Sequence, residues 1–109
     1  MLELEVTQEH IQNADPDSVF QWAIALALQG ECATGVSVDM TSIDFRDKTG
    51  EELEYKCSNQ LAAWQNDTIK HKRCTEIIKP IVINFVDAPL YDGFSTHYNG
   101  IAEIKEYIC

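Results

Sequence analysis

DPDSVFQWAIALALQG, the stretch from Asp15 to Gly30, carries signals for the start, the body and the end of one helix. Asp15 is a preferred N-cap, and Pro16 suits the first helical position because its missing N–H has no helical partner there. Gly30 can adopt the left-handed conformation that often ends a helix. We therefore predict a helix over residues 15–30 and expect the rest of the chain to be organised around it.

The predicted helix is apolar on two neighbouring sides. At about 100° per residue, Phe20, Ile24 and Leu28 share one side, which we expect to face a sheet. A second stripe lies beside it and consists of Val19, Trp22 and Leu26. So wide an apolar arc needs cover on more than one side. The second stripe therefore meets another part of the same chain, such as its C-terminal segment, or a second copy in a homodimer.

Alternating apolar residues predict the strands of the sheet. The predicted strands cover residues 2–6, 36–40, 43–45, 53–57 and 77–86. The apolar residues change from even to odd positions between Met40 and Ile43, so a bulge or a tight turn is expected at residues 41–42. Residues 47–50 have the composition of a turn. Pro80 favours a strand that begins there or that lies at the edge of the sheet.

Further helices are predicted on both sides of these strands. Thr7 can cap a short helical turn, but the residue three places on is His10 rather than Glu or Gln, so no capping box is expected. A second main helix begins after Ser58 and ends in the basic residues 70–73, where cations stabilise a helix end. Residues 87–100 are typical of a long loop, and Ile101, Ile104, Tyr107 and Ile108 have helical spacing.

This order of elements predicts an α+β fold, with a mainly antiparallel sheet of four to five strands and two main helices packed on it. The length predicts a single domain over residues 1–109, and 45% hydrophobic with 24% charged residues is ordinary for a soluble chain. No stretch has the length of a membrane span, and the N-terminal MLELEV lacks the positive region of a signal peptide. We expect a cytoplasmic protein with no membrane partner.

The chain is strongly acidic, with 18 acidic residues, 8 Lys or Arg residues and a formal net charge of −10. Residues 1–45 contain no Lys or Arg at all. Such a surface repels nucleic acids and attracts basic protein surfaces, although the same acidity could serve only solubility. If it is a binding surface, its acidic contact residues are Glu3, Glu5, Glu9, Asp39 and Asp44.

Catalytic and metal-binding motifs are absent from the sequence, so we predict a non-enzymatic protein without cofactor or metal. The cysteines are Cys32, Cys57, Cys74 and Cys109, and they include no Cys-x-x-Cys pair. A zinc site from Cys57, Cys74 and His71 is not expected, because these residues lie at opposite ends of one predicted helix. We expect reduced thiols that behave as small apolar residues.

Aromatic residues gather between residues 91 and 98. The recognition residues we predict in this segment are Tyr91, Phe94, His97 and Tyr98. Aromatic loops on a rigid scaffold often bind partners, because their rings supply contact area at low entropic cost. The same residues could instead cover an open end of the core, or take part in binding a small ligand.

Several short motifs resemble a loose group of small proteins carried by bacteriophages and mobile elements. They are Val6–Ile11, Ile24–Leu28, Val36–Asp39 and Lys79–Ile81, within residues 5–86. The resemblance implies a phage setting, in which small acidic proteins often bind and block host machinery, including restriction and CRISPR nucleases. It transfers no functional residue, because the group has no motif of known role.

The leading hypothesis is thus a phage-type protein that binds a basic surface of a host protein and inhibits it, with an anti-CRISPR role as its sharpest form. A second hypothesis is a homo-oligomeric accessory protein joined through the stripe of Val19, Trp22 and Leu26. A third is a protein that sequesters a small ligand at the aromatic segment.

Overall fold

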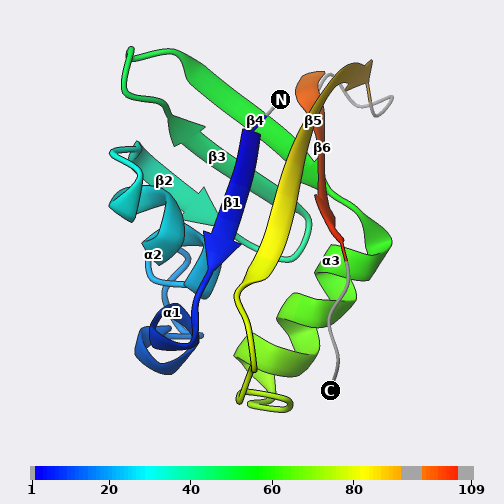
Figure 1. Ribbon diagram of the computed structural model, residues 1–109. Helices are drawn as coiled ribbons and strands as arrows, with labels where there is room; N and C mark the ends of the chain where they lie inside the picture. The colour runs from blue at the N-terminus through cyan, green and yellow to red at the C-terminus, as the bar shows by residue number, and fades with distance from the viewer. Residues whose placement is uncertain (1, 92–96, 106–109) are drawn as a thin grey trace.

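Six strands form one mixed sheet within residues 2–91 and 97–105, the part of the chain that the computed structural model describes (Figure 1). The strands are β1 (Leu2–Val6), β2 (Thr34–Val38), β3 (Ser42–Arg46), β4 (Glu52–Cys57), β5 (Ile81–Tyr91) and β6 (His97–Ile104). They lie in the order β1-β5-β6-β4-β3-β2. Among these strands β4 and β6 are parallel, whereas the other neighbouring pairs are antiparallel. The predicted α+β class is confirmed, but the predicted number of four to five strands is wrong.

The helices are α1 (Gln8–Asn13), α2 (Ala23–Gly30) and α3 (Asn59–Trp64), and α3 continues into the π-helix η1 (Gln65–Lys70). Ser58 caps α3 as predicted, because its Oγ accepts a hydrogen bond from the backbone N of Leu61 at 3.1 Å. A capping box does close at α1, contrary to expectation. Thr7 Oγ1 accepts from the backbone N of His10, and His10 Nδ1 accepts from the backbone N of Thr7 at 3.0 Å.

Helix α2 begins at Ala23, eight residues later than predicted. The Asp15 carboxylate accepts a hydrogen bond from the backbone N of Asp17 at 2.9 Å and so forms a turn instead of capping a helix. Tertiary contacts hold the following residues: the Val19 carbonyl accepts from the backbone N of Val38 at 2.9 Å. Asp residues favour both helix starts and turns, and here the turn prevails.

The late start of α2 also changes the two predicted apolar stripes. Ile24 and Leu28 are buried as expected, but Phe20 lies before the helix and is 61% exposed. Trp22 is buried within the chain, with its indole N–H donating to the Pro16 carbonyl at 3.2 Å and Lys70 Nζ 5.5 Å from the ring centroid. Val19, Trp22 and Leu26 therefore do not form one helical stripe for a second copy to cover.

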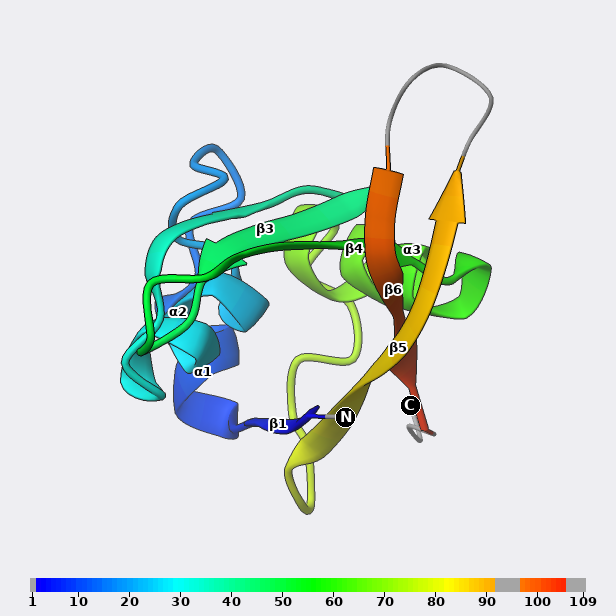
Figure 2. The same ribbon diagram turned by 90° about the horizontal axis from the view of Figure 1, so that it is seen from above.

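The sheet curls so strongly that its two edge strands, β1 and β2, both contact helix α2 (Figures 1 and 2). Strands β1 and β5 form one wall, β2, β3 and β4 form the opposite wall, and β6 joins them (Figure 2). Helix α2 lies in the gap between the edge strands, and α3 packs against β4 and β6. The core lies between the two walls.

The core is made of the inward residues of every strand together with apolar residues of the helices. Its aromatic centre is formed by Phe45, Tyr55 and Phe85, whose ring centroids lie 5.0–6.2 Å apart. The Tyr55 hydroxyl donates to Asp87 Oδ1 at 2.6 Å at the end of this cluster. Burial first, and then this hydrogen bond, raises the pKa of Tyr55, so the phenol stays protonated.

The C-terminal part is a hairpin of β5 and β6, not the predicted loop and helix. Strand β5 begins at Ile81, directly after Pro80, but it lies between β1 and β6 and is not an edge strand. At Gly100 a side chain has no room, since a Cβ would lie 1.8 Å from the carbonyl oxygen of Val86. The tail prediction at Tyr107 and Ile108 lies outside the described residues.

Candidate acidic binding face

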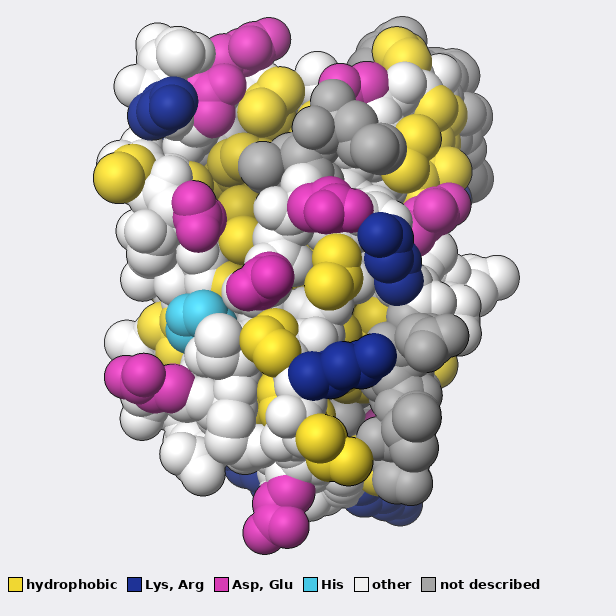
Figure 3. Space-filling view, in the orientation of Figure 1, with side chains coloured by type: hydrophobic (Ala, Val, Ile, Leu, Met, Phe, Trp, Pro, Cys, Tyr) yellow, Lys and Arg dark blue, Asp and Glu magenta, His cyan; other side chains and the backbone are white. Residues whose placement is uncertain are grey.

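The outer face of the curled sheet carries most of its charged residues, because side chains alternate between core and solvent along each strand. Outward residues include Glu3 and Glu5 on β1, Asp44 and Arg46 on β3, Glu52, Glu54 and Lys56 on β4, and Glu103 on β6. Figure 3 shows one side of the molecule, on which acidic side chains are spread between hydrophobic ones. The acidic surface is therefore distributed and not gathered in one patch on that side.

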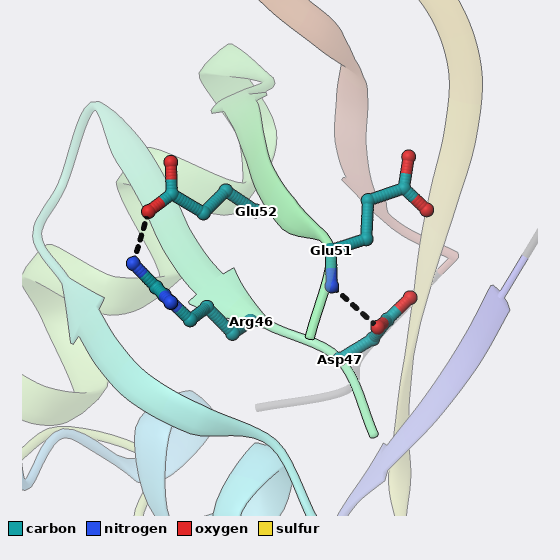
Figure 4. Close-up of polar contacts among 4 residues, drawn as sticks. All are labelled: Arg46, Asp47, Glu51 and Glu52. Atoms are coloured by element: carbon teal, nitrogen blue, oxygen red, sulfur yellow. Dashed lines mark hydrogen bonds and ion pairs between the residues drawn. The ribbon is translucent and has the colours of Figure 1, made fainter. Parts of the chain in front are cut away.

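A trough lies on the outer face of the wall formed by β3 and β4. We call it the acidic trough and define it by Asp44, Arg46, Glu52, Glu54 and Asn99, which line a hollow of about 380 Å³ together with Gly35, Phe45 and Leu53. Arg46 is directly opposite Glu52 across the two strands and forms an ion pair with it (Figure 4). The trough thus contains three carboxylates and one guanidinium group.

The next cross-strand pair in the trough consists of two acids. Asp44 lies directly opposite Glu54. Like charges at directly opposite positions destabilise a sheet. The backbone N of Glu54 donates to Asn99 Oδ1 at 2.9 Å, which ties β4 to β6 at this row. Two acidic residues are therefore held directly opposite each other by the pairing of β3 with β4 and by the tie to β6.

Asp44 has an unfavourable environment for a charged side chain. Its side chain is half-buried, and its Oδ1 atom is buried without a hydrogen-bond partner among the described residues. Burial, and second the negative charge of Asp39, raise the pKa of Asp44 above its ordinary value of 3.8. A buried acceptor without a donor costs free energy. The ionised form of Asp44 is therefore disfavoured in the folded protein.

The two aspartates that flank β3 serve the turns at its ends. Asp39 Oδ1 accepts hydrogen bonds from Thr41 N, Thr41 Oγ1 and Ser42 N at 2.7–2.9 Å, which forms the predicted turn. Asp47 Oδ1 accepts from Thr49 N and Thr49 Oγ1 at 2.9 and 2.6 Å. It also accepts from Glu51 N at 3.1 Å (Figure 4). These bonds, led by that from the Thr49 hydroxyl, lower the pKa of Asp47. Both carboxylates have clear structural roles.

The structure separates the acidic residues that the sequence suggested for one binding surface. Glu3 and Glu5 lie on the β1 wall, where Glu3 forms an ion pair with Lys105 at 3.0 Å, and Asp44 lies on the opposite wall (Figure 2). Glu9 is on α1, outside the sheet. Glu52 and Glu54 were not predicted, although the alternation in residues 52–57 already places both on one face of a strand.

The aromatic residues proposed for recognition belong in part to the β5–β6 hairpin. Tyr91 pairs with His97 across its strands, and Leu90 pairs with Tyr98. Phe94 lies outside the described residues, so recognition by this group stays a prediction. Leu90 also lines a second hollow of about 290 Å³ on the outer face, with Lys56, Ile101 and Glu103 among its other residues.

A group of buried polar residues lies where β4 is followed by α3 and η1. Gln65 is fully buried, and its Nε2 donates to the Asp39 carbonyl at 2.8 Å and contacts Cys57 Sγ at 3.8 Å. Gln65 Oε1 and Thr68 Oγ1 are buried without a partner among the described residues. Burial, and then the charges of Asp39 and Asp44, raise the pKa of Cys57 to about 12. The Cys57 thiol is therefore a poor nucleophile near neutral pH.

The cysteines differ in state, which corrects the expectation of four reduced thiols. Cys32 and Cys57 are free, and Cys74 is disulfide-bonded. Within residues 2–91 and 97–105, no group of three or more His, Cys, Asp or Glu side chains has a geometry that could hold a metal ion. None of the described helices has the length and hydropathy to cross a membrane.

Comparison of the chain with protein-family models, curated proteins and solved structures gives no match.

Proposed function

We propose that this protein is a non-enzymatic binding protein that docks a basic surface of another protein at the acidic trough. The observation that carries the proposal is the acidic trough itself, in which Asp44 lies directly opposite Glu54 and has a buried carboxylate oxygen without a partner among the described residues. Basic side chains of a partner would bring opposite charge to the acidic residues of the trough. The net charge of −10 adds a long-range attraction for such a partner.

The resemblance to small phage proteins extends this proposal to inhibition. Nucleases of host defence systems carry basic surfaces that bind nucleic acid, and an acidic protein bound there would compete with the substrate. This extension rests on the resemblance and on charge. The second hypothesis, a homodimer through Trp22, was based on an uncovered apolar stripe. Trp22 is buried in its own chain, so it does not need a second copy to cover it.

The test is an affinity purification from bacterial lysate with the wild-type chain and two variants of equal charge. The trough variant carries Asp44→Asn and Glu54→Gln, and the control variant carries Glu9→Gln and Asp17→Asn, two changes outside the sheet. We expect a partner that the wild type and the control retain, that the trough variant releases, and that salt elutes. A partner retained equally by both variants, or none at all, would contradict the proposal.

A further inference from the structure

The β5–β6 hairpin lies in the middle of the sheet, although its strands are the last two that the structure describes. It pairs with β1 on one side and with β4 on the other. Within the described sheet β1 does not pair with β4, so the hairpin fills a gap between them, which we call the slot (Figure 2). The two walls of the sheet are therefore joined only when a hairpin occupies the slot.

One exposed segment connects the hairpin to the preceding part of the chain. We call residues 71–80 the hinge, which runs from the end of η1 to the start of β5 and contains no helix or strand (Figure 1). None of its residues is buried. Lys72 and Cys74 have left-handed backbone conformations, with φ angles of 55° and 52°. This conformation costs free energy in residues other than glycine, so the observed hinge is strained.

Polar contacts hold the strained hinge in its observed conformation. The Gln8 side chain donates a hydrogen bond to the Thr75 carbonyl and accepts one from the backbone N of Ile77 at 2.7 Å. The backbone N of Arg73 donates to the Asp67 carbonyl at 2.8 Å. These contacts join the hinge to α1 and η1, and they are lost when the hinge extends.

The disulfide of Cys74 does not tie the hinge to the part of the chain before it. Cys32 and Cys57 are the cysteines of that part, and both are free. The hairpin can therefore leave the slot of its own chain without reduction of that bond.

We infer that the slot also binds the hairpin of a second copy of this chain, in a dimer in which two copies exchange β5 and β6 through extended hinges. The pairing of β1 with β5 and of β4 with β6 is then formed again between the copies. Extension of the hinge releases the left-handed conformations of Lys72 and Cys74, which favours exchange. The inference is independent of the proposed function, because each half of the dimer keeps its acidic trough.

Refolding of the full chain from urea at low and at high protein concentration tests this inference, because unfolding frees the hairpin from its own slot. Size-exclusion chromatography with light scattering separates monomer from dimer, and circular dichroism shows that both are folded. We expect the dimer fraction to rise with protein concentration during refolding. The dimer should persist on dilution, since its dissociation requires both hairpins to leave their slots. Monomer alone at every concentration overturns the inference.

A cross-strand disulfide distinguishes exchange from other dimers. Glu5 on β1 lies directly opposite Val82 on β5. Chains with Glu5→Cys and chains with Val82→Cys, all carrying Cys32→Ser to remove the exposed free thiol, are refolded together and oxidised. Exchange brings the two new thiols together from different chains, so we expect a disulfide-linked heterodimer. In the control mixture Glu52→Cys, on β4, replaces Glu5→Cys. Equal linkage in the two mixtures overturns exchange.

Two Lys to Gly variants of equal charge test the hinge. Lys72→Gly removes the strain from the closed hinge and should lower the ratio of dimer to monomer about tenfold. Lys79→Gly changes a hinge residue without the left-handed conformation, and should alter this ratio by less than about twofold. Gln8→Ala, which loses both contacts to the closed hinge, should raise the ratio. Equal ratios in the two Gly variants would overturn the role of the strained hinge.

Discussion

The two faces of strand β3 differ in what they require of their residues. On the inner face, Ile43 and Phe45 are buried in the core. On the outer face, Asp44 lies between them, is half-buried and is directly opposite Glu54, and its Oδ1 atom has no hydrogen-bond partner among the described residues. The inner residues stabilise the fold, and the outer residue opposes it. Side chains that oppose folding are expected at functional positions, because function can offset their cost.

The largest expected effect tests the inner face. Phe85→Ala should lower the free energy of unfolding by about 3–5 kcal/mol, because Phe85 is fully buried and its ring contacts both Phe45 and Tyr55. Val86→Ala changes the next residue, which is half-buried on the outer face, and should cost about 1 kcal/mol. Urea unfolding followed by circular dichroism measures both. Equal losses of unfolding free energy in the two variants would contradict the difference that we describe between the inner and the outer face.

A smaller effect is expected where the core itself contains polar atoms. Thr68→Val replaces a buried hydroxyl that has no partner among the described residues by a methyl group of similar shape. We expect the free energy of unfolding to rise by about 1 kcal/mol. Thr68→Ser, which keeps the hydroxyl and loses the methyl group, should be less stable than the wild type. A loss of stability in Thr68→Val would show that the hydroxyl has a partner in solution.

On the outer face, Asp44→Asn should stabilise the protein at neutral pH. The raised pKa of Asp44 means that the folded protein holds this proton more tightly than the unfolded chain does, so ionisation weakens the fold as the pH rises above 3.8. The gain in Asp44→Asn should therefore disappear when the pH is lowered below this value. Unfolding curves of the variant and the wild type from pH 3 to pH 7, at about one-unit steps, measure the difference.

The smallest expected effect is at Asp47 in the neighbouring turn, where substitution should lower the free energy of unfolding instead of raising it. The lowered pKa of Asp47 means that its ionised form stabilises the fold above pH 3.8, and that this contribution is lost as the pH falls through the lower folded value. Asp47→Asn should therefore be slightly less stable than the wild type at neutral pH and should approach it in acid. The same unfolding series includes this variant. A gain at pH 7 would contradict the role of the turn hydrogen bonds.

Much of the sheet could be predicted from the sequence, because a period of two is a local signal. It located β1 to β4, the turn at residues 41–42 and the turn at residues 47–50. The start of α2 could not be found in this way, since Asp15 and Pro16 suit a turn as well as a helix start. Strand β6 was missed because Ile101 and Ile104 are three residues apart, and because β5 and β6 are joined through residues typical of a loop.

Of the candidate site, only its negative charge could be predicted from the sequence. Local patterns do not give the curl of the sheet, so they could not show that Glu3 and Asp44 lie on opposite walls. The pairing of Asp44 with Glu54 depends on the register of the β3–β4 hairpin. Its register follows from the turn that begins at Asp47, but the half-burial of Asp44 depends on neighbouring strands and cannot be read from the hairpin alone.

Helix α2 contacts both edge strands of the sheet, and this limits how another protein can be recognised. A peptide that adds itself as a seventh strand beside β1 or β2 must first displace the helix, together with Ile24 and Leu28, from the core. A complex formed by backbone pairing at those edges would therefore carry the free-energy cost of displacing the helix. The same arrangement hinders edge-to-edge pairing of sheets from different molecules. We therefore expect this chain to stay free of fibres at high concentration.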